Sequence, residues 1–238
     1  PEHTVWLLCA PSPEDMIATI RSRCRHLGLR IPTASAVADL LVREGVATPE
    51  VALEAARAAQ SHIGLARALA RDPQMRERRR AIITAPASVR SVGEAVMAAD
   101  RLLETAKAQA DAQVSERNAR EKAELMRQLG MDEGESATKA SRTMLRQLEE
   151  DQKRRSKRAL TDAIDRALID LLAIYRDVLM VQVGGDGELI NTDLSDLVHE
   201  IAQESTPRQT LARVDHIETA RKRLVSNGNP LLVLEDMA

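Results

Sequence analysis

The chain has 238 residues, a length that suits one or two domains with cores of their own. It contains no Phe, one Trp and one Tyr, and 29% of its residues are charged. Its apolar residues are mostly Ala, Leu and Val, so the composition favours closely packed helices. The formal net charge of −2 excludes a global positive field for nucleic acid. The sequence shows no signal peptide and no apolar run of membrane length, so we expect no membrane partner.

No catalytic or metal-binding motif is present. The sequence lacks a phosphate-binding loop ending in Gly-Lys-Ser/Thr, a G-x-S-x-G turn, an H-E-x-x-H pair and closely spaced cysteine pairs. The five histidines are scattered, and the two cysteines, Cys9 and Cys24, lie far apart. We therefore expect no cofactor and no metal ion in this chain, a buried reduced thiol at Cys9, and a cytoplasmic setting.

Residues 1–32 predict a strand, a helix and a second strand. Residues 5–9 (VWLLC) form a continuous apolar run, which is typical of a strand buried on both faces of a mainly parallel sheet. Ser12 and Pro13 suit the cap and the first position of a helix, and residues 27–31 suit the next strand. Because a buried strand needs sheet partners that this sequence does not supply, we expect the chain to be the C-terminal part of a larger protein.

The predicted helix leads into the sequence ATIRSRCR at residues 18–25. In its strand–helix–strand setting, this segment resembles the end of the AAA+ ATPase domain of clamp-loader subunits. Its form is most similar to the delta-prime family of the bacterial DNA polymerase III clamp loader. The resemblance implies that Arg23, in the motif Ser22, Arg23 and Cys24, reaches an ATP molecule that the neighbouring subunit holds with magnesium. A guanidinium can stabilise the negative charge that phosphoryl transfer spreads over the transferred group.

One departure from the family pattern bears on which subunit the chain resembles. ATPase-active members carry a polar sensor residue, often Thr, just after the strand, where this chain has Ala10 and Pro11. Neither side chain can orient an attacking water, so the resemblance favours a delta-prime subunit over a gamma/tau subunit. Without the resemblance, Arg21, Arg23 and Arg25 would be interpreted as a solvated helix end, where cations are favourable.

Residues 33–82 are expected to form a three-helix lid domain. The first helix stops at Gly45, the second begins at Thr48 and Pro49, and the third covers about residues 62–70. The resemblance implies a sensor-2 arginine near the start of the third helix in relatives that bind ATP. The alignment for that position is ambiguous between Leu65, Ala66 and Arg67.

Residues 83–238 predict a helical collar with a long projecting hairpin. Apolar residues keep helical spacing at both ends of the hairpin, mixed charges dominate residues 117–158, and GMDEGES at residues 130–136 breaks the pattern. The basic runs at residues 76–80 and 153–158 are interpreted as solvated faces, with phosphate contact as the alternative. The closing segment NPLLVLEDMA resembles the last helix of the family's oligomerisation collar.

The leading prediction is a mainly α chain that serves as a non-hydrolysing scaffold subunit of the DNA polymerase III clamp loader. The resemblance implies that Arg23 acts in trans on a neighbour's ATP during ATP-driven loading of the sliding clamp in DNA replication. Implied partners are the gamma/tau and delta subunits, the sliding clamp through the complex, and primed DNA indirectly. One alternative is a gamma/tau-like ATPase whose phosphate loop lies upstream. Another is a helical adaptor without a role in replication.

Overall fold

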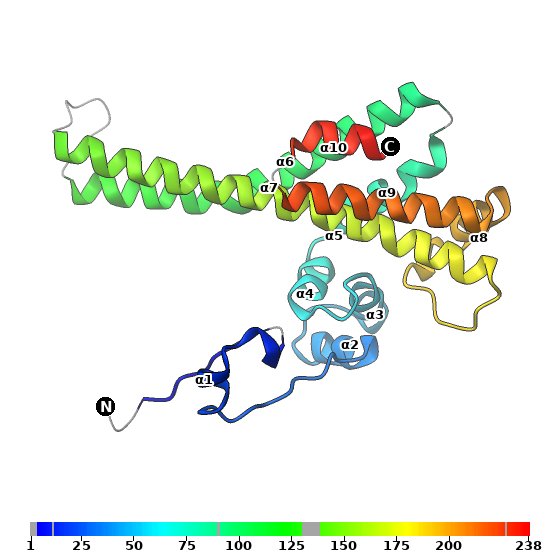
Figure 1. Ribbon diagram of the computed structural model, residues 1–238, viewed down its shortest axis with the longest axis horizontal. Coiled ribbons are helices and arrows are strands. Elements are labelled where there is room, and N and C mark those ends of the chain that lie inside the picture. Colours follow the sequence, from blue (N-terminus) through cyan, green and yellow to red (C-terminus); the bar gives the residue numbers. More distant parts are fainter. Residues whose placement is uncertain (1–3, 11, 90, 130–138, 227) are drawn as a thin grey trace. The chain divides into compact units, whose positions relative to one another are not determined.

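The computed structural model describes residues 4–10, 12–89, 91–129, 139–226 and 228–238 (Figure 1). The described residues are mainly helical and contain no strand, which confirms the prediction of a mainly α chain. Two compact units are present, Pro1–Thr33 and Ala34–Ala238. No helix in the described ranges is both long enough and apolar enough to cross a membrane.

The first unit contains little regular structure. It has one 3-10 turn, Pro13–Asp15, and one short helix, α1 (Ala18–Arg21). The sequence predicts that Ser12 caps a helix, but here it caps only the 3-10 turn, and α1 is a separate short helix: the Ser12 Oγ accepts a hydrogen bond from the Glu14 backbone N–H, and the Ser12 N–H donates to Asp15.

The two predicted strands are not formed in this unit. Residues 4–10 and 25–33 have no regular backbone structure, and most of their large apolar side chains are 78–95% exposed. A strand exists only when another strand pairs with it, and the described residues of the unit supply no such partner. The expectation of a buried thiol is wrong for the same reason, since Cys9 is exposed; Cys24 is exposed as well.

Three short helices open the second unit, as predicted: α2 (Ala34–Arg43), α3 (Pro49–Ala58) and α4 (Ile63–Arg71). Gly45 ends the first of them with φ of +66°, a left-handed conformation that glycine adopts without steric cost. The helices share a core that is rich in alanine, whose small side chains allow the backbones to approach closely. The members that are at most 1% exposed are Val37, Leu41, Ala52, Ala55, Ala56 and Ala66.

The sequence analysis missed a fourth helix, α5 (Pro73–Thr84), which is followed by the 3-10 turn η2 (Ala85–Ser88). Asp72 caps α5 by accepting a hydrogen bond from the Gln74 backbone, and Pro73 occupies the first turn. Apart from the fully buried Ile83, the helix has few apolar residues and therefore no clear apolar stripe.

The rest of the unit is built on two long helices, α6 (Val92–Gln128) and α7 (Lys139–Gln182), which lie side by side (Figure 1). The turn η3 (Thr192–Leu194) and three further helices complete it: α8 (Ser195–Glu204), α9 (Pro207–Val225) and α10 (Pro230–Met237). The core runs along α7 and gathers side chains from α5 to α10. Its fully buried members are Ile83, Ile164, Leu168, Val178, Val198 and Leu234.

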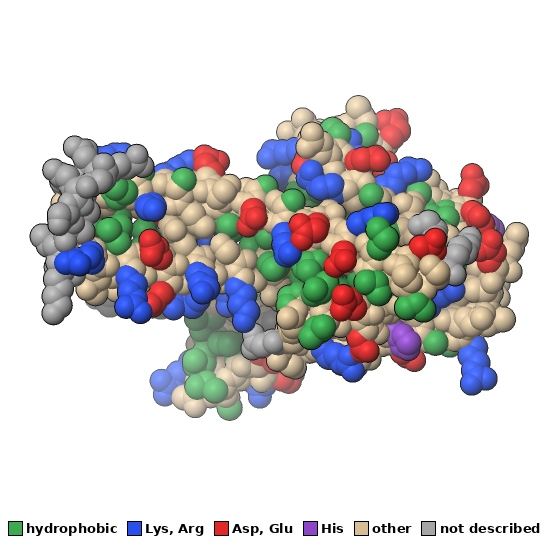
Figure 2. All heavy atoms as spheres, turned by 90° about the horizontal axis from the view of Figure 1, so that it is seen from above, with side chains coloured by type: hydrophobic (Ala, Val, Ile, Leu, Met, Phe, Trp, Pro, Cys, Tyr) green, Lys and Arg blue, Asp and Glu red, His purple; other side chains and the backbone are tan. Residues whose placement is uncertain are grey.

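The outer halves of α6 and α7 pack on each other through a narrow apolar seam and polar contacts. Arg155 donates to Asn118 Oδ1 and to Glu121, each at 2.8 Å, and Gln152 donates to the Asn118 carbonyl at 2.9 Å. Arg155 and Arg117 together lower the pKa of Glu121 to about 2. Both basic and acidic side chains lie on the surface of this pair (Figure 2). The predicted break at residues 130–136 lies outside the described residues.

Candidate functional site

The three motif residues Ser22, Arg23 and Cys24 lie together in the turn that ends α1. The Ser22 backbone N–H donates to the Ala18 carbonyl, and its Oγ donates to the Thr19 carbonyl at 3.2 Å. The Arg23 backbone N–H donates to the Ile20 carbonyl at 3.0 Å. Main-chain hydrogen bonds therefore fix the backbone of the turn, while Arg23 is exposed.

The guanidinium of Arg23 is exposed, and no carboxylate in the described part of the chain pairs with it. The same holds for Arg21, the last residue of α1, and for Arg25 in the segment that follows. The three arginines differ in backbone setting: Arg21 ends the helix, Arg23 lies in the turn, and Arg25 lies in chain without regular structure.

This turn presents a positive charge that can bind an anion. An arginine offers five N–H donors in a planar fork that matches phosphate oxygens, and it stays protonated at all physiological pH values. Within the described ranges, no three His, Cys, Asp or Glu side chains gather into a possible metal site. The turn therefore presents an exposed guanidinium that is able to bind an anionic group.

Arg67, the weaker candidate from the sequence, is occupied by an internal partner. Its Nε and NH2 groups donate to the two carboxylate oxygens of Glu44 at 3.0 and 2.9 Å. This forked pair ties α4 to the end of α2, and both side chains remain about one-third exposed. The contact explains the arginine as a structural group of the three-helix cluster.

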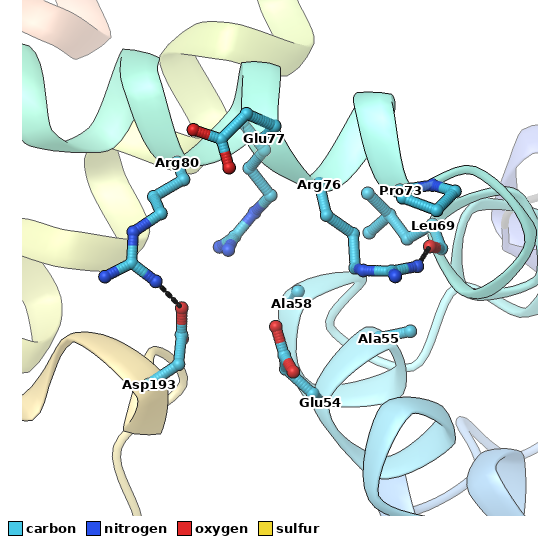
Figure 3. A pocket seen from close by; sticks show the side chains of 10 residues that line it. Glu54, Ala55, Ala58, Leu69, Pro73, Arg76, Glu77, Arg80 and Asp193 are labelled. Atoms are coloured by element: carbon cyan, nitrogen blue, oxygen red, sulfur yellow. Dashed lines mark hydrogen bonds and ion pairs between the residues drawn. The ribbon is translucent and has the colours of Figure 1, made fainter. Parts of the chain in front are cut away.

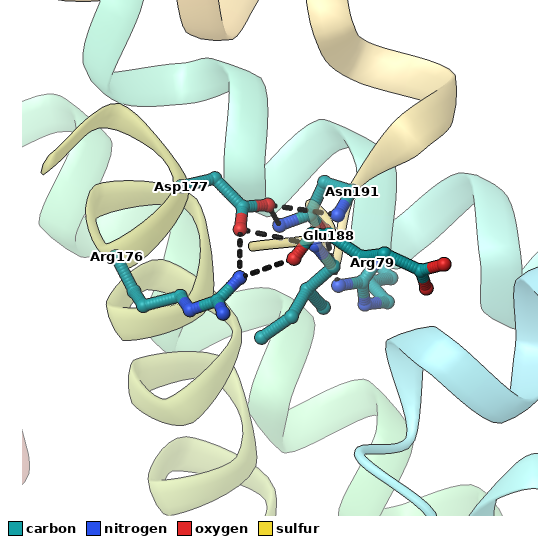
Figure 4. A network of polar contacts seen from close by, with 6 residues as sticks. Arg79, Arg176, Asp177, Glu188 and Asn191 are labelled. Carbon is teal, nitrogen blue, oxygen red and sulfur yellow. Dashed lines mark hydrogen bonds and ion pairs between the residues drawn. The ribbon is translucent and has the colours of Figure 1, made fainter. Parts of the chain in front are cut away.

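A polar network that the sequence analysis missed joins α5, α7 and the chain before η3 (Figure 4). Asp177 is fully buried and accepts hydrogen bonds from the backbone N–H groups of Ile190 and Asn191, at 3.0 and 2.8 Å. Asn191 Nδ2 also donates to Asp177, at 2.9 Å. Arg79 donates to Asn191 Oδ1 at 2.6 Å and to Asp170 at 3.0 Å. These partners satisfy buried groups that would otherwise destabilise the junction.

The prediction that residues 76–80 form a solvated face is wrong for Arg79. Helical spacing places Arg79 on the same face as the fully buried Ile83, so its side chain enters the interior. The sequence of α7 contains an indication that such a contact exists. Asp170 and Asp177 fall among the apolar positions of the predicted helix, and buried carboxylates require donors from elsewhere.

A cavity of about 300 Å³ lies between α3, α5 and η3 (Figure 3). Two of its arginines already have partners: Arg76 donates to the Leu69 carbonyl at 2.6 Å, and Arg80 pairs with Asp193 at 3.6 Å. Carboxylates from α3 and α5 also line the cavity. Its charges therefore balance, and it offers no excess positive charge to a nucleotide phosphate.

Comparison with known proteins gives one informative similarity. The chain is 37% identical over 67 residues to the DNA polymerase III subunit delta' of Bacillus subtilis (strain 168), a segment that covers 28% of this chain. The chain spans 20% of the length of that relative. No family model matches the chain, and no solved structure matches it. The similarity supports a relationship with clamp-loader subunits and leaves the type of subunit open.

Proposed function

We propose that the chain is a non-hydrolysing subunit of a DNA polymerase III clamp loader, of the delta-prime type. The observation that carries the proposal is the similarity over 67 residues to a delta' subunit. The exposed Ser-Arg-Cys turn adds to it. In this proposal residues 33–82 act as a lid and residues 83–238 as the collar that assembles with gamma/tau and delta subunits. The sliding clamp and primed DNA are then engaged through the complex.

In this proposal Arg23 donates hydrogen bonds to the phosphate of an ATP that the adjacent subunit binds with magnesium. Phosphoryl transfer places its charge on oxygens that a guanidinium fork can meet. Within the described residues the Arg23 side chain has no partner that it would have to give up when such a site forms, and its turn is held by backbone hydrogen bonds. Ala10, which cannot orient water, supports the assignment of hydrolysis to the neighbour rather than to this subunit.

Reconstitution of the complex with Arg23→Ala tests this function. Donated arginines contribute about 10³-fold or more to the rate in well-studied systems, and a loader has several ATP sites, so the total rate should fall less. We expect clamp-stimulated ATP turnover and clamp loading to fall at least about threefold while the subunits still co-elute. Arg23→Lys should restore only part of the activity, because an ammonium lacks the planar fork.

Arg21→Ala is the matched control, since Arg21 is equally exposed and also lacks an ion-pair partner among the described residues. Its complex should retain nearly normal turnover. Normal turnover and loading by the Arg23→Ala complex would exclude a role for this arginine in trans. Calorimetry with ATP and magnesium should give no saturable heat for the chain alone. Micromolar binding would instead favour a gamma/tau-like subunit.

A further inference from the structure

An open apolar groove of about 350 Å³ lies among α5, α6, α7, α9 and α10. This volume is within the range of sites that bind small molecules or single side chains of a peptide. Leu102, Leu171, Tyr175 and Ile217 line it together with alanines of α6. Ile217 also belongs to the hydrophobic core of the unit, so the groove adjoins that core.

The single tyrosine of the chain contributes an unused hydrogen-bonding group to this groove. Tyr175 is only 6% exposed, and its hydroxyl has no hydrogen-bond partner among the described residues. The hydroxyl oxygen is not one of the polar atoms that are sealed off from solvent without a partner, so it opens into the groove, where water or a ligand can accept its hydrogen bond. A ligand that enters the groove can supply the missing acceptor.

The ionisable side chains that line the groove, Tyr175 aside, are all basic. They are Arg101, Arg213 and His216, and no Asp or Glu side chain of the described residues lines the groove. The guanidinium of Arg213 lies 5.7 Å from the centre of the Tyr175 ring, and neither arginine has a carboxylate partner in the described part of the chain. The whole chain has 36 acidic and 34 basic residues, so an acid-free lining departs from its average surface.

We propose that this groove binds a short acidic peptide segment of a partner protein, with one aromatic or large aliphatic side chain as its anchor. The anchor packs on Leu102, Leu171 and Ile217, where burial of apolar surface provides the main driving force. Carboxylates of the peptide pair with Arg101 and Arg213, and one peptide oxygen accepts the Tyr175 hydroxyl hydrogen. A nucleic acid fits less well, since it requires a longer basic track than two arginines. This proposal does not rest on the clamp-loader function.

Fluorescence polarisation with a labelled peptide of sequence Gly-Asp-Glu-Asp-Leu-Phe tests the groove in the full chain. We expect a dissociation constant on the order of 10–100 μM, typical of a short, shallowly bound peptide. Arg213→Glu should weaken binding at least about tenfold, because it replaces a charge-assisted contact with repulsion. Tyr175→Phe should weaken it about threefold, since only the hydroxyl is lost.

Arg208→Glu is the matched control, because Arg208 is exposed on the same helix and does not line the groove. It should bind the peptide like the wild type, and far-UV circular dichroism checks that each variant is folded. The proposal is overturned if the peptide does not bind, or if Arg208→Glu and Arg213→Glu weaken binding equally. It is also overturned if Gly-Asp-Glu-Asp-Gly-Ser, which lacks the anchor, binds as well. Equal competition by an oligothymidine would reassign the groove to nucleic acid, and self-association abolished by Arg213→Glu would reassign it to a second copy.

Discussion

Removal of Arg79 is expected to destabilise the second unit by about 3–5 kcal/mol, the cost of leaving one partner of a buried ion pair alone. The side chains of Arg79 and Asp170 are only 11% and 8% exposed, and their contact is 3.0 Å long. Arg79 also donates to Asn191 Oδ1 at 2.6 Å. In Arg79→Leu, both acceptors therefore lose a charged donor in a site that water cannot easily enter.

The charge of Asp170 explains why a variant that lacks both Arg79 and Asp170 should be more stable than one that lacks only Arg79. Burial raises the pKa of Asp170, and the attraction of Arg79 opposes this only in part. The pair is therefore held at a desolvation cost, and replacing both partners by leucine removes that cost together with the contact. We expect Arg79→Leu combined with Asp170→Leu to recover more than half of the free energy that Arg79→Leu loses.

The pH dependence has a defined sign. A carboxyl whose folded pKa is raised binds its proton more tightly in the folded state, so the stability it contributes is present at acid pH. That contribution is lost as the pH rises from about 4, the unfolded pKa, through the folded pKa. Arg79→Leu raises the folded pKa of Asp170 further. The defect of the variant should therefore be smaller at about pH 5 than at about pH 7.

Urea unfolding followed by far-UV circular dichroism measures these differences, because almost all helical residues belong to the second unit. Arg80→Leu is the matched control. Arg80 is the next residue on α5 and pairs with Asp193 at 3.6 Å, but its side chain is 52% exposed. We expect it to cost less than about 1 kcal/mol. Equal losses for Arg79→Leu and Arg80→Leu would show that burial of the pair does not set its energetic weight.

Two further predictions concern α7. Asp177→Ala should destabilise the unit by about 2–4 kcal/mol in the same assay, because the backbone N–H groups of Ile190 and Asn191 lose their buried acceptor. An Asp177→Ala variant as stable as the wild type would contradict this. Burial raises the pKa of Tyr175 above 10, and Arg213 opposes this only in part. Its absorbance titration should therefore be shifted upward, with stability lost as the pH rises above about 10, and an ordinary titration midpoint would refute the burial.

The helices that could be predicted are those whose ends carry local signals. Thr206 and Gln209 form the reciprocal cap that begins α9, and Asn229 caps α10 just ahead of Pro230. Gly45 and Gly184 end their helices with φ of +66°. These capping interactions involve residues that are three or four positions apart, so the helix ends can be predicted from the local sequence.

The features that could not be predicted depend on distant partners. An apolar run such as residues 5–9 becomes a strand only beside another strand, and the described residues provide none. Arg79 belongs to a charged run whose pattern predicts a solvated face. Its burial follows from a contact with Asp170, which lies 91 residues further along the chain. The local sequence pattern identifies a charged run, but it does not show which residue of the run is buried.

Arg79 and Arg23 are a buried and an exposed example of the same side chain. Arg79 donates hydrogen bonds to buried acceptors of its own chain, so its substitution should lower the free energy of unfolding. The donors of Arg23 have no acceptor within the described residues and face solvent, so its substitution should leave unfolding unchanged. A loss of ATP turnover in a complex with Arg23→Ala could then not be attributed to unfolding. If the Arg23→Ala chain is as stable as the wild type, a lower rate of ATP turnover in its complex can be assigned to the loss of the guanidinium.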